Sequence, residues 1–141
     1  MTAPIRPIID LCILIPCYNN SDGLIKSLQS ISYKKDSFSI IIVDDGSLEP
    51  VTLEKLGPDF TDLKDVKIIR SETNQGITKA LNKGLKFIYS HYTVQFIGRL
   101  DCGDICSPQR FYTQIAFFEQ HPDIHLTGTW CYFKNNFTGE A

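Results

Sequence analysis

The sequence lacks a long hydrophobic run, a basic stretch and a recognisable secretion signal. Its longest apolar stretches, such as residues 40–43, are far shorter than the roughly 20 residues that a membrane-spanning helix needs. Residues 1–10 contain two prolines and no apolar core of signal-peptide length. The 14 Lys and Arg are nearly balanced by 16 Asp and Glu, whereas nucleic-acid binding relies on a basic surface. We therefore expect a soluble cytoplasmic chain with no nucleic-acid partner.

Cysteine is scarce and odd in number. Five cysteines fit a reducing compartment better than a disulfide framework. Cys12, Cys17 and Cys131 lie in apolar or strand-like surroundings, which predicts small buried side chains. Cys102 and Cys106 are close enough in sequence to suggest zinc, but no second Cys or His pair with structural-zinc spacing accompanies them. A zinc site is therefore not favoured.

What the sequence does have is the composition of an ordinary globular domain. Hydrophobic residues make up 43% and charged residues 21% of the 141 positions, which excludes a disordered tail. A chain of this length buries roughly two-thirds of its unfolded surface without a disulfide or metal. It contains no repeat, low-complexity tract or linker, so we expect one domain spanning residues 1–141.

Apolar runs alternate with amphipathic segments along the chain. Buried strands are predicted at residues 8–15, 38–43, 66–69, 94–97 and 124–129. Helices are predicted from the cap residues 20–22 through residue 31, at 51–56, at 77–89, and from Ser107-Pro108 to about residue 121. This alternation predicts an α/β fold with a Rossmann-like, mostly parallel sheet flanked by helices.

Polar clusters follow three of these strands, at residues 16–19, 44–47 and 101–104. The carboxyl ends of parallel strands share one edge, where open α/β sheets bind ligands. The aspartates of the last two clusters would repel one another there, and a divalent cation that binds phosphates relieves such repulsion. Helix capping explains either aspartate pair alone equally well. Both pairs on one edge favour a ligand site.

Two nucleotide-binding patterns are absent. The turn after the first strand has no glycine-rich phosphate loop, which argues against a dinucleotide site, and the P-loop pattern is missing too. A phosphoreceiver-like signalling domain is an alternative, because it is an α/β unit of similar size whose clustered aspartates bind magnesium. Its acidic pair should follow the first strand, however, and here the pair follows the second.

Four segments in order resemble glycosyltransferase family 2, the inverting nucleotide-sugar transferases with the A-type glycosyltransferase fold. They are ILIPCYNNSDGLIKSLQSI, IIIVDDGS, NQGITKALNKGL and FIGRLDCGDICSPQRFYTQIAFFEQHPDIHLTGTW, and they cover most of the chain from about Leu11 to Trp130. The resemblance implies a nucleotide-diphospho-sugar transferase fold, a donor that is usually UDP-linked, a saccharide acceptor and Mg²⁺ or Mn²⁺. It also implies a role in polysaccharide or cell-surface glycan synthesis, with peripheral association of the full-length enzyme at the inner face of the membrane.

The resemblance also assigns roles to residues. Pro16, Tyr18 and Asn19 would line the nucleoside pocket, and Asp45, with Asp44 as the less certain member of the pair, would accept a hydrogen bond from the base. Residues of the third segment would shape the nucleotide side of the cleft; they are Asn74, Gly76, Lys79 and Asn82. Backbone geometry is the alternative for Gly76 and the favoured explanation for Gly84, and a solvated helix face is the alternative for Lys79.

The acidic motif departs from the family's common Asp-x-Asp-Asp form, because Gly103 stands at the usual metal-ligand position. Asp101 would still reach the ribose or a metal-bound water, and Asp104 would take over coordination. Arg99 would reach the diphosphate or form a salt bridge with Asp101 or Asp104.

A second departure concerns the general base. Family members normally continue into an acceptor-binding half that carries this base, so we expect the chain to stop before that half. Glu140 is a poor candidate, because a terminal residue has no supporting shell. A non-catalytic nucleotide-sugar-binding module is therefore the second alternative.

Overall fold

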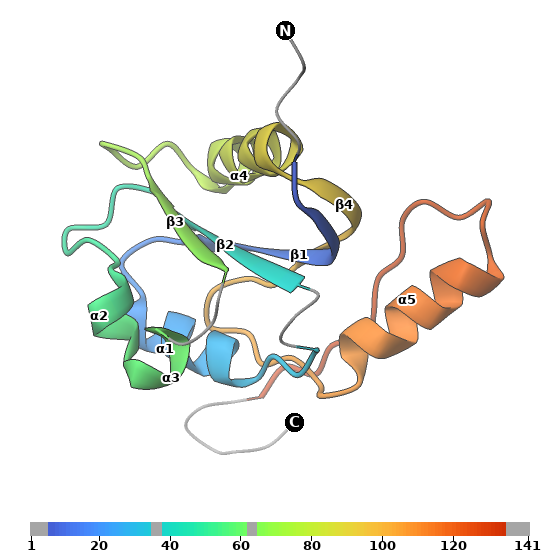
Figure 1. The fold of residues 1–141 in the computed structure, drawn as a ribbon. Helices are drawn as coiled ribbons and strands as arrows, with labels where there is room; N and C mark the ends of the chain where they lie inside the picture. The colour runs from blue at the N-terminus through green and yellow to red at the C-terminus, as the bar shows by residue number, and fades with distance from the viewer. Residues whose placement is uncertain (1–5, 35–37, 62–64, 135–141) are drawn as a thin grey trace, which may run out of the picture. The chain divides into compact units, whose positions relative to one another are not determined.

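The computed structural model describes residues 6–34, 38–61 and 65–134. Within them, four strands form one parallel sheet in the order β3-β2-β1-β4 (Figure 1). The strands are β1 (Ile8–Cys17), β2 (Phe38–Asp44), β3 (Val66–Arg70) and β4 (Thr93–Arg99). The helices are α1 (Ser21–Gln29), α2 (Leu53–Leu56), α3 (Pro58–Thr61), α4 (Ile77–His91) and α5 (Arg110–Gln120). The predicted α/β class with a parallel sheet flanked by helices is confirmed.

The chain divides into two compact units, Met1–Pro108 and Gln109–Ala141. The first contains the whole sheet and helices α1 to α4. The second contains α5, whose Arg110 Nε donates to Gln114 Oε1 at 3.2 Å, followed by residues 121–134 without regular secondary structure.

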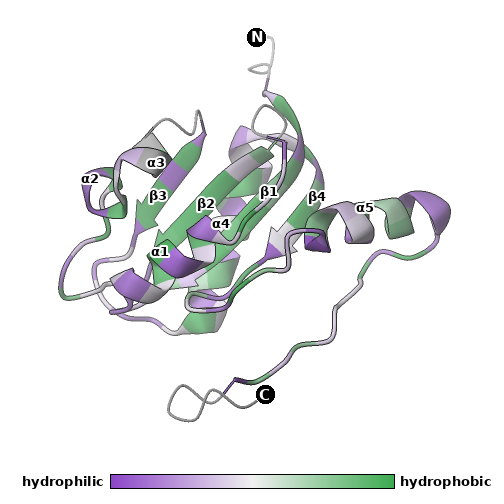
Figure 2. Ribbon diagram, turned by 90° about the horizontal axis from the view of Figure 1, so that it is seen from below, coloured by the Kyte–Doolittle hydropathy of each residue, from purple (hydrophilic) through white to green (hydrophobic). Residues whose placement is uncertain are grey.

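The core of the first unit lies between the sheet and α4. Strand β1 is buried from Leu11 to Cys17 and β2 from Ser39 to Asp44, as expected of central strands covered on both faces. Figures 1 and 2 show α4 on one face of the sheet, with α1, α2 and α3 on the other side. The strands are the most hydrophobic part of this unit (Figure 2).

Close packing explains Gly84, for which the sequence favoured backbone geometry. The residue lies inside α4, and a Cβ built there would stand 2.3 Å from Leu14 Cδ1 and 3.0 Å from Val43 Cγ2. Its backbone is helical and not in the left-handed region. Glycine is therefore needed here because α4 packs directly on β1 and β2.

Most element boundaries agree with the sequence to within about two residues, and the differences have local causes. Asn20 caps α1 as predicted, its Oδ1 accepting from Gly23 N at 3.0 Å, but the helix ends at Gln29. Strand β1 continues past Pro16 to Cys17. Proline has no N–H to donate to a neighbouring strand, but the pairing of β1 with β4 already ends at Leu14, so Pro16 breaks no hydrogen bond between these two strands. Helix α5 begins at Arg110 and not at Pro108.

Two predictions for the second unit are wrong. Residues 124–129 form no strand: Ile124 is 39% exposed and Leu126 is 88% exposed. An apolar run favours burial, but a strand also requires a backbone partner that the run does not specify. Cys131, predicted to be buried, is exposed.

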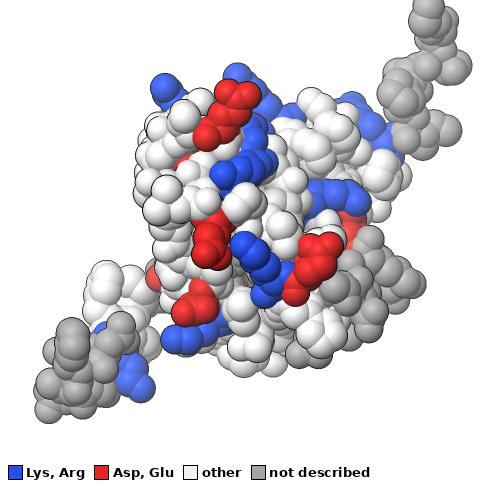
Figure 3. Space-filling model, turned by 90° about the vertical axis from the view of Figure 1, so that its left-hand side faces the viewer, with Lys and Arg blue, Asp and Glu red and all other residues white. Residues whose placement is uncertain are grey.

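No helix in the described part of the chain is both long and apolar enough to cross a membrane. On the face seen in Figure 3, Lys and Arg side chains are interspersed with Asp and Glu. This face therefore presents no large patch of one charge.

Candidate functional site

A pocket of about 300 Å³ opens at the carboxyl edge of the sheet in the first unit. Its wall comes from the end of β1, the turn after β2, the start of α4 and the loop after β4. The lining residues are Pro16, Cys17, Tyr18, Asn20, Asp45, Asn74, Ile77, Ala80, Asp101 and Cys102. The position is the one at which parallel α/β sheets bind ligands, and the volume is at the small end of ligand sites.

Asp45 is the buried carboxylate of this wall, with only 3% of the residue exposed. Its Oδ2 accepts from Gln75 N at 3.0 Å and from Gly76 N at 2.8 Å. Among the residues that the structure describes, Oδ1 has one longer contact, of 3.2 Å with Gln75 N. Gly76 has a φ of +90°, a conformation that favours glycine and that turns the chain into α4. One oxygen of Asp45 is thus fixed by backbone, and the other retains acceptor capacity.

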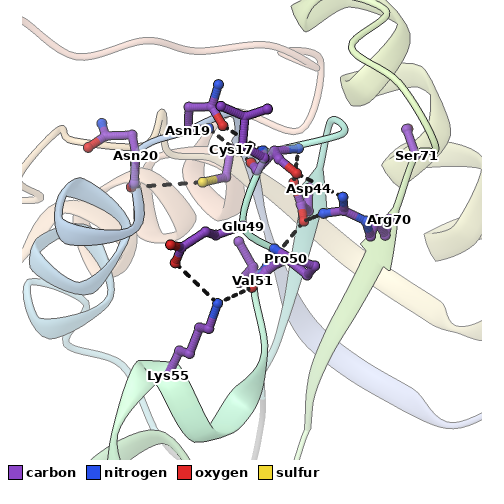
Figure 4. Close-up of polar contacts among 12 residues, drawn as sticks. Cys17, Asn19, Asn20, Asp44, Glu49, Pro50, Val51, Lys55, Arg70 and Ser71 are labelled. Carbon is purple, nitrogen blue, oxygen red and sulfur yellow. Dashed lines mark hydrogen bonds and ion pairs between the residues drawn. The ribbon is translucent and has the colours of Figure 1, made fainter.

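Asp44 has a different environment (Figure 4). It is fully buried, and its oxygens accept from Ser47 N at 2.9 Å and Val51 N at 3.1 Å. Arg70 forms an ion pair with the same carboxylate and donates to Ser47 O at 2.8 Å. Burial alone would raise the pKa of Asp44, but the hydrogen bonds to the carboxylate outweigh it and hold the pKa below its ordinary value. Asp44 therefore organises the turn after β2 and is not among the pocket-lining residues.

Asn19 joins the loop after β1 to the turn after β2. Its N donates to Ser47 Oγ at 2.9 Å, and its Oδ1 accepts from Leu48 N at 2.8 Å. It adopts a φ of +50°, a left-handed conformation that asparagine tolerates better than most residues. These contacts place the neighbouring Tyr18, which is 48% exposed, on the pocket wall.

The acidic loop after β4 is held mainly through its backbone. Ser27 of α1 is fully buried; its Oγ donates to Asp104 O at 2.8 Å and accepts from Gly103 N at 2.9 Å. Arg99 donates to both carboxylate oxygens of Asp101, at 2.7 and 2.8 Å. This contact raises the pKa of Arg99. Arg99 thus forms the salt bridge with Asp101 that the sequence left as one alternative.

The described residues do not form a metal centre. No group of three or more His, Cys, Asp and Glu side chains with suitable geometry occurs among residues 6–34, 38–61 and 65–134. Both oxygens of Asp101 contact Arg99. Gly103, which supplies no ligand, has a φ of +104°, so the turn itself favours glycine at this position. Asp101 and Asp104 therefore do not fit a divalent cation without further ligands.

The structure brings together only part of the residue set expected from the sequence. Five of the expected residues line the pocket, namely Pro16, Tyr18, Asp45, Asn74 and Asp101. Gly76 and Asn19 support the wall through the contacts above, whereas Lys79 and Asn82 are exposed on α4 and outside the lining. The predicted nucleotide role of all these residues stays a prediction.

Sequence reasoning missed five lining residues, which are Cys17, Asn20, Ile77, Ala80 and Cys102. Ile77 and Ala80 were detectable in principle, because they occupy the first turn of a helix at the expected edge of the sheet. Asn20 is the helix cap that the sequence predicts, and this role does not indicate its place on the pocket wall. Cys17 and Cys102 lie within the polar motifs at residues 16–19 and 101–104, but the sequence pattern alone does not indicate that they line the pocket.

Cys17 and Cys102 contact each other on the pocket wall, with their Sγ atoms 3.5 Å apart. Asn20 O accepts from Cys102 Sγ at 3.2 Å and from Cys17 Sγ at 3.9 Å. The hydrogen bond between the thiols lowers the pKa of Cys17 and raises that of Cys102, since one S–H stabilises the other sulfur as an anion.

A parallel α/β sheet with a pocket at its carboxyl edge defines a ligand-binding unit of the doubly wound kind. The sequence profile of Glycosyl transferase family 2 matches residues 12–140. The chain belongs to this family.

Known glycosyltransferases are similar to the chain in sequence or in fold. The amylovoran biosynthesis glycosyltransferase AmsE of Erwinia amylovora is 33% identical over 121 residues, covering 82% of this chain and 43% of that protein. The chain thus spans less than half the length of this relative.

Two solved structures show the same fold at lower identity. S. aureus TarS in complex with UDP-GlcNAc superposes with a TM-score of 0.64 at 23% identity, covering 81% of this chain and 32% of that one. The mannosyltransferase PcManGT of Pyrobaculum calidifontis, in complex with GDP-Man and Mn²⁺, gives 0.66 at 18% identity, covering 81% and 33%. The expected nucleotide-diphospho-sugar transferase fold is confirmed.

Proposed function

We propose that this chain is the donor-binding part of an inverting glycosyltransferase. The protein would transfer a sugar from a UDP-linked donor to a saccharide acceptor in polysaccharide or cell-surface glycan synthesis. Family membership supports the reaction class. UDP-GlcNAc bound to TarS and the amylovoran pathway named for AmsE support the donor and the product class.

The observation that carries the proposal is the asymmetric environment of the Asp45 carboxylate. Oδ2 is held by two backbone N–H groups, while Oδ1 retains acceptor capacity at the pocket wall. Uracil offers one imide N–H on its pairing edge, which one carboxylate oxygen satisfies. Guanine offers two adjacent donors, of which one free carboxylate oxygen satisfies only one, and adenine has a ring acceptor in place of the imide N–H, which the negative carboxylate leaves unpaired. An unpaired buried polar group costs about 1–3 kcal/mol.

The apolar part of the wall suits a flat base. Tyr18 presents a half-exposed ring beside Pro16 and Ile77. A base stacked on an aromatic side chain gains about 1–3 kcal/mol without discriminating among bases. Tyr18 therefore contributes affinity, and Asp45 contributes the choice of base.

The proposal assigns no step to Mg²⁺ or Mn²⁺, because the described residues do not fit a metal on their own. We assign the negative charge of the diphosphate to Arg99, whose side chain is 53% exposed and forms an ion pair with the pocket-lining Asp101. A positive group there would stabilise the departing diphosphate as the bond to the sugar breaks.

The proposal places the general base and the acceptor-binding surface in the part of the relatives that this chain does not span. Inverting transfer requires a base that takes the proton of the acceptor hydroxyl as its oxygen attacks the anomeric carbon. The 141-residue chain is then expected to bind a UDP-sugar without transferring the sugar. Robust transfer to a saccharide by the purified chain would contradict this division.

Calorimetry with UDP, GDP and ADP, which differ only in the base and carry the same diphosphate, tests the proposal, with EDTA present so that metal plays no part. UDP is expected to bind about tenfold or more tightly than the other two, and Asp45→Asn to lose most of this preference. Asp10→Asn is the matched control, because Asp10 is exposed near the opposite end of β1. Equal affinity for all three nucleotides, or unchanged UDP binding in folded Asp45→Asn, would reject the proposal.

A further inference from the structure

Two cysteines from distant parts of the sequence lie in contact on the pocket wall. Cys17 is the last residue of β1, and Cys102 belongs to the loop after β4. Their sulfur atoms are 3.5 Å apart, and both residues line the pocket. A small molecule that enters the pocket therefore meets two neighbouring thiols.

The separation is short enough for a bond to form after a small movement. A disulfide requires an S–S distance of about 2.05 Å, so the sulfurs must approach by about 1.5 Å. Cys17 is fixed by its parallel pairing with Asp44 in β2. Cys102 lies in a tight turn, closed by the bond from Asp104 N to Asp101 O at 3.0 Å, and is only half-buried. The turn after β4 would supply the movement.

We propose that Cys17 and Cys102 are a modification site, at which a hydroperoxide forms a disulfide that weakens nucleotide binding. In the first step, one thiol attacks the hydroperoxide, whose O–O bond breaks; the products are a sulfenic acid and the alcohol of the hydroperoxide, which is water where the oxidant is hydrogen peroxide. In the second step, the other thiol attacks the sulfenic sulfur, the S–O bond breaks and water leaves. The two thiols together lose two electrons and two protons, and the hydroperoxide is reduced.

The disulfide would change the pocket because its neighbours share the same wall. Asp101 directly precedes Cys102, and Asn20 Nδ2 donates to Cys102 O at 3.4 Å. Moving Cys102 toward β1 therefore displaces Asp101 and alters the Asn20 contact, and all of these residues line the pocket. The effect on nucleotide rests on the proposed function, whereas formation of the bond does not.

Peptide mapping of the Cys131→Ser chain tests the bond itself, since the exposed Cys131 would otherwise link molecules to one another. After hydrogen peroxide treatment and non-reducing digestion, the peptides containing Cys17 and Cys102 are expected to be joined, and a reductant should separate them. Adding Cys17→Ser or Cys102→Ser should abolish this link. Absence of the link in folded protein, or its persistence in either serine variant, would overturn the proposal.

UDP calorimetry on reduced and oxidised protein tests the consequence. Oxidation is expected to weaken UDP binding about tenfold or more, and reduction to restore it. Saturating UDP present during oxidation should slow formation of the link. Equal UDP affinity before and after linkage would overturn the effect on binding. If the link forms but reduced protein binds no UDP, the proposed function fails while the modification site stands.

Discussion

The acidic turn after β2 and the acidic loop after β4 look alike in sequence but are built differently. Asp44 and Asp45 are both buried and accept hydrogen bonds from backbone N–H groups. Asp101 is half-buried and Asp104 is exposed. The loop is fixed by backbone contacts to Ser27, and the Asp101 carboxylate contacts the exposed Arg99.

The difference separates a preorganised recognition element from an adaptable one. A carboxylate whose partners are already in place loses little further freedom when it binds a ligand. A half-exposed ion pair exchanges partners at little cost, because water replaces much of the interaction. We therefore expect the turn after β2 to choose the base, and the loop after β4 to adjust to the diphosphate and sugar.

The largest effect is expected from Asp44→Asn. The substitution removes the charge that pairs with Arg70 and turns an amide N–H₂ toward a backbone donor. Breaking a buried ion pair from one side costs about 3–5 kcal/mol, and we expect about 3 kcal/mol because Arg70 is partly exposed. Urea unfolding measures this loss, with Asp10→Asn as the control. Stability equal to wild type would refute the structural role of Asp44.

In the wild-type chain, the free energy of unfolding should fall at acid pH as the Asp44 carboxylate takes up a proton. The pKa of Asp44 is lower in the folded protein than its ordinary value, so the unfolded chain takes up the proton first as the pH falls. The stabilisation is complete above about pH 4 and is lost below it, as the pH falls through the folded pKa. Unfolding free energies measured across this range should fall less steeply for Asp44→Asn than for wild type. Parallel curves would contradict the assignment.

The next largest loss of stability is expected from substituting Gly103 in the loop after β4. Its φ of +104° and a Cβ position 3.3 Å from Asn20 Nδ2 make Gly103→Ala costly by about 1–2 kcal/mol. Gly103→Asp, which would restore the common metal-ligand position, faces the same strain. Thermal unfolding measures the change, and Gly128→Ala, where a Cβ meets nothing within 4 Å, is the control. Equal effects of the two alanine substitutions would rule out strain at Gly103.

The smallest stability effect is expected from Arg99→Ala. Its ion pair with Asp101 is half exposed, with side-chain exposures of 53% and 38%, and such pairs contribute about 0–1 kcal/mol. The UDP affinity should nevertheless fall, and the loss should shrink for uridine, which has no phosphate. Comparing UDP with uridine in calorimetry separates the two effects. Equal losses for both ligands would place Arg99 outside the diphosphate site.

The sheet was largely predictable because buried parallel strands are continuous apolar runs ended by polar residues. The runs before Pro16, Asp44 and Arg99 each gave a strand whose end lies within two residues of the expected one. The edge on which the polar clusters meet followed from the parallel arrangement. The predicted strand at 124–129 is absent, because an apolar run does not by itself specify the backbone partner that a strand requires.

The site was less predictable, because adjacent residues have different environments. Asp44 and Asp45 are neighbours, and nothing in the spacing shows that one contacts Arg70 and the other the start of α4. The contact between Cys17 and Cys102 joins positions 85 residues apart. Such pairs depend on how the loops after β1 and β4 meet, which the sequence pattern does not specify.

Backbone amide NMR during titration of the chain with UDP tests the central claim most directly. Gln75 N and Gly76 N donate to Asp45, whereas Ser47 N and Val51 N donate to Asp44. If Asp45 binds the base, the Gln75 and Gly76 resonances should shift with UDP in a saturable way, and those of Ser47 and Val51 should change little. Shifts confined to Ser47 and Val51, or no saturable shift at Gln75 and Gly76, would contradict the account.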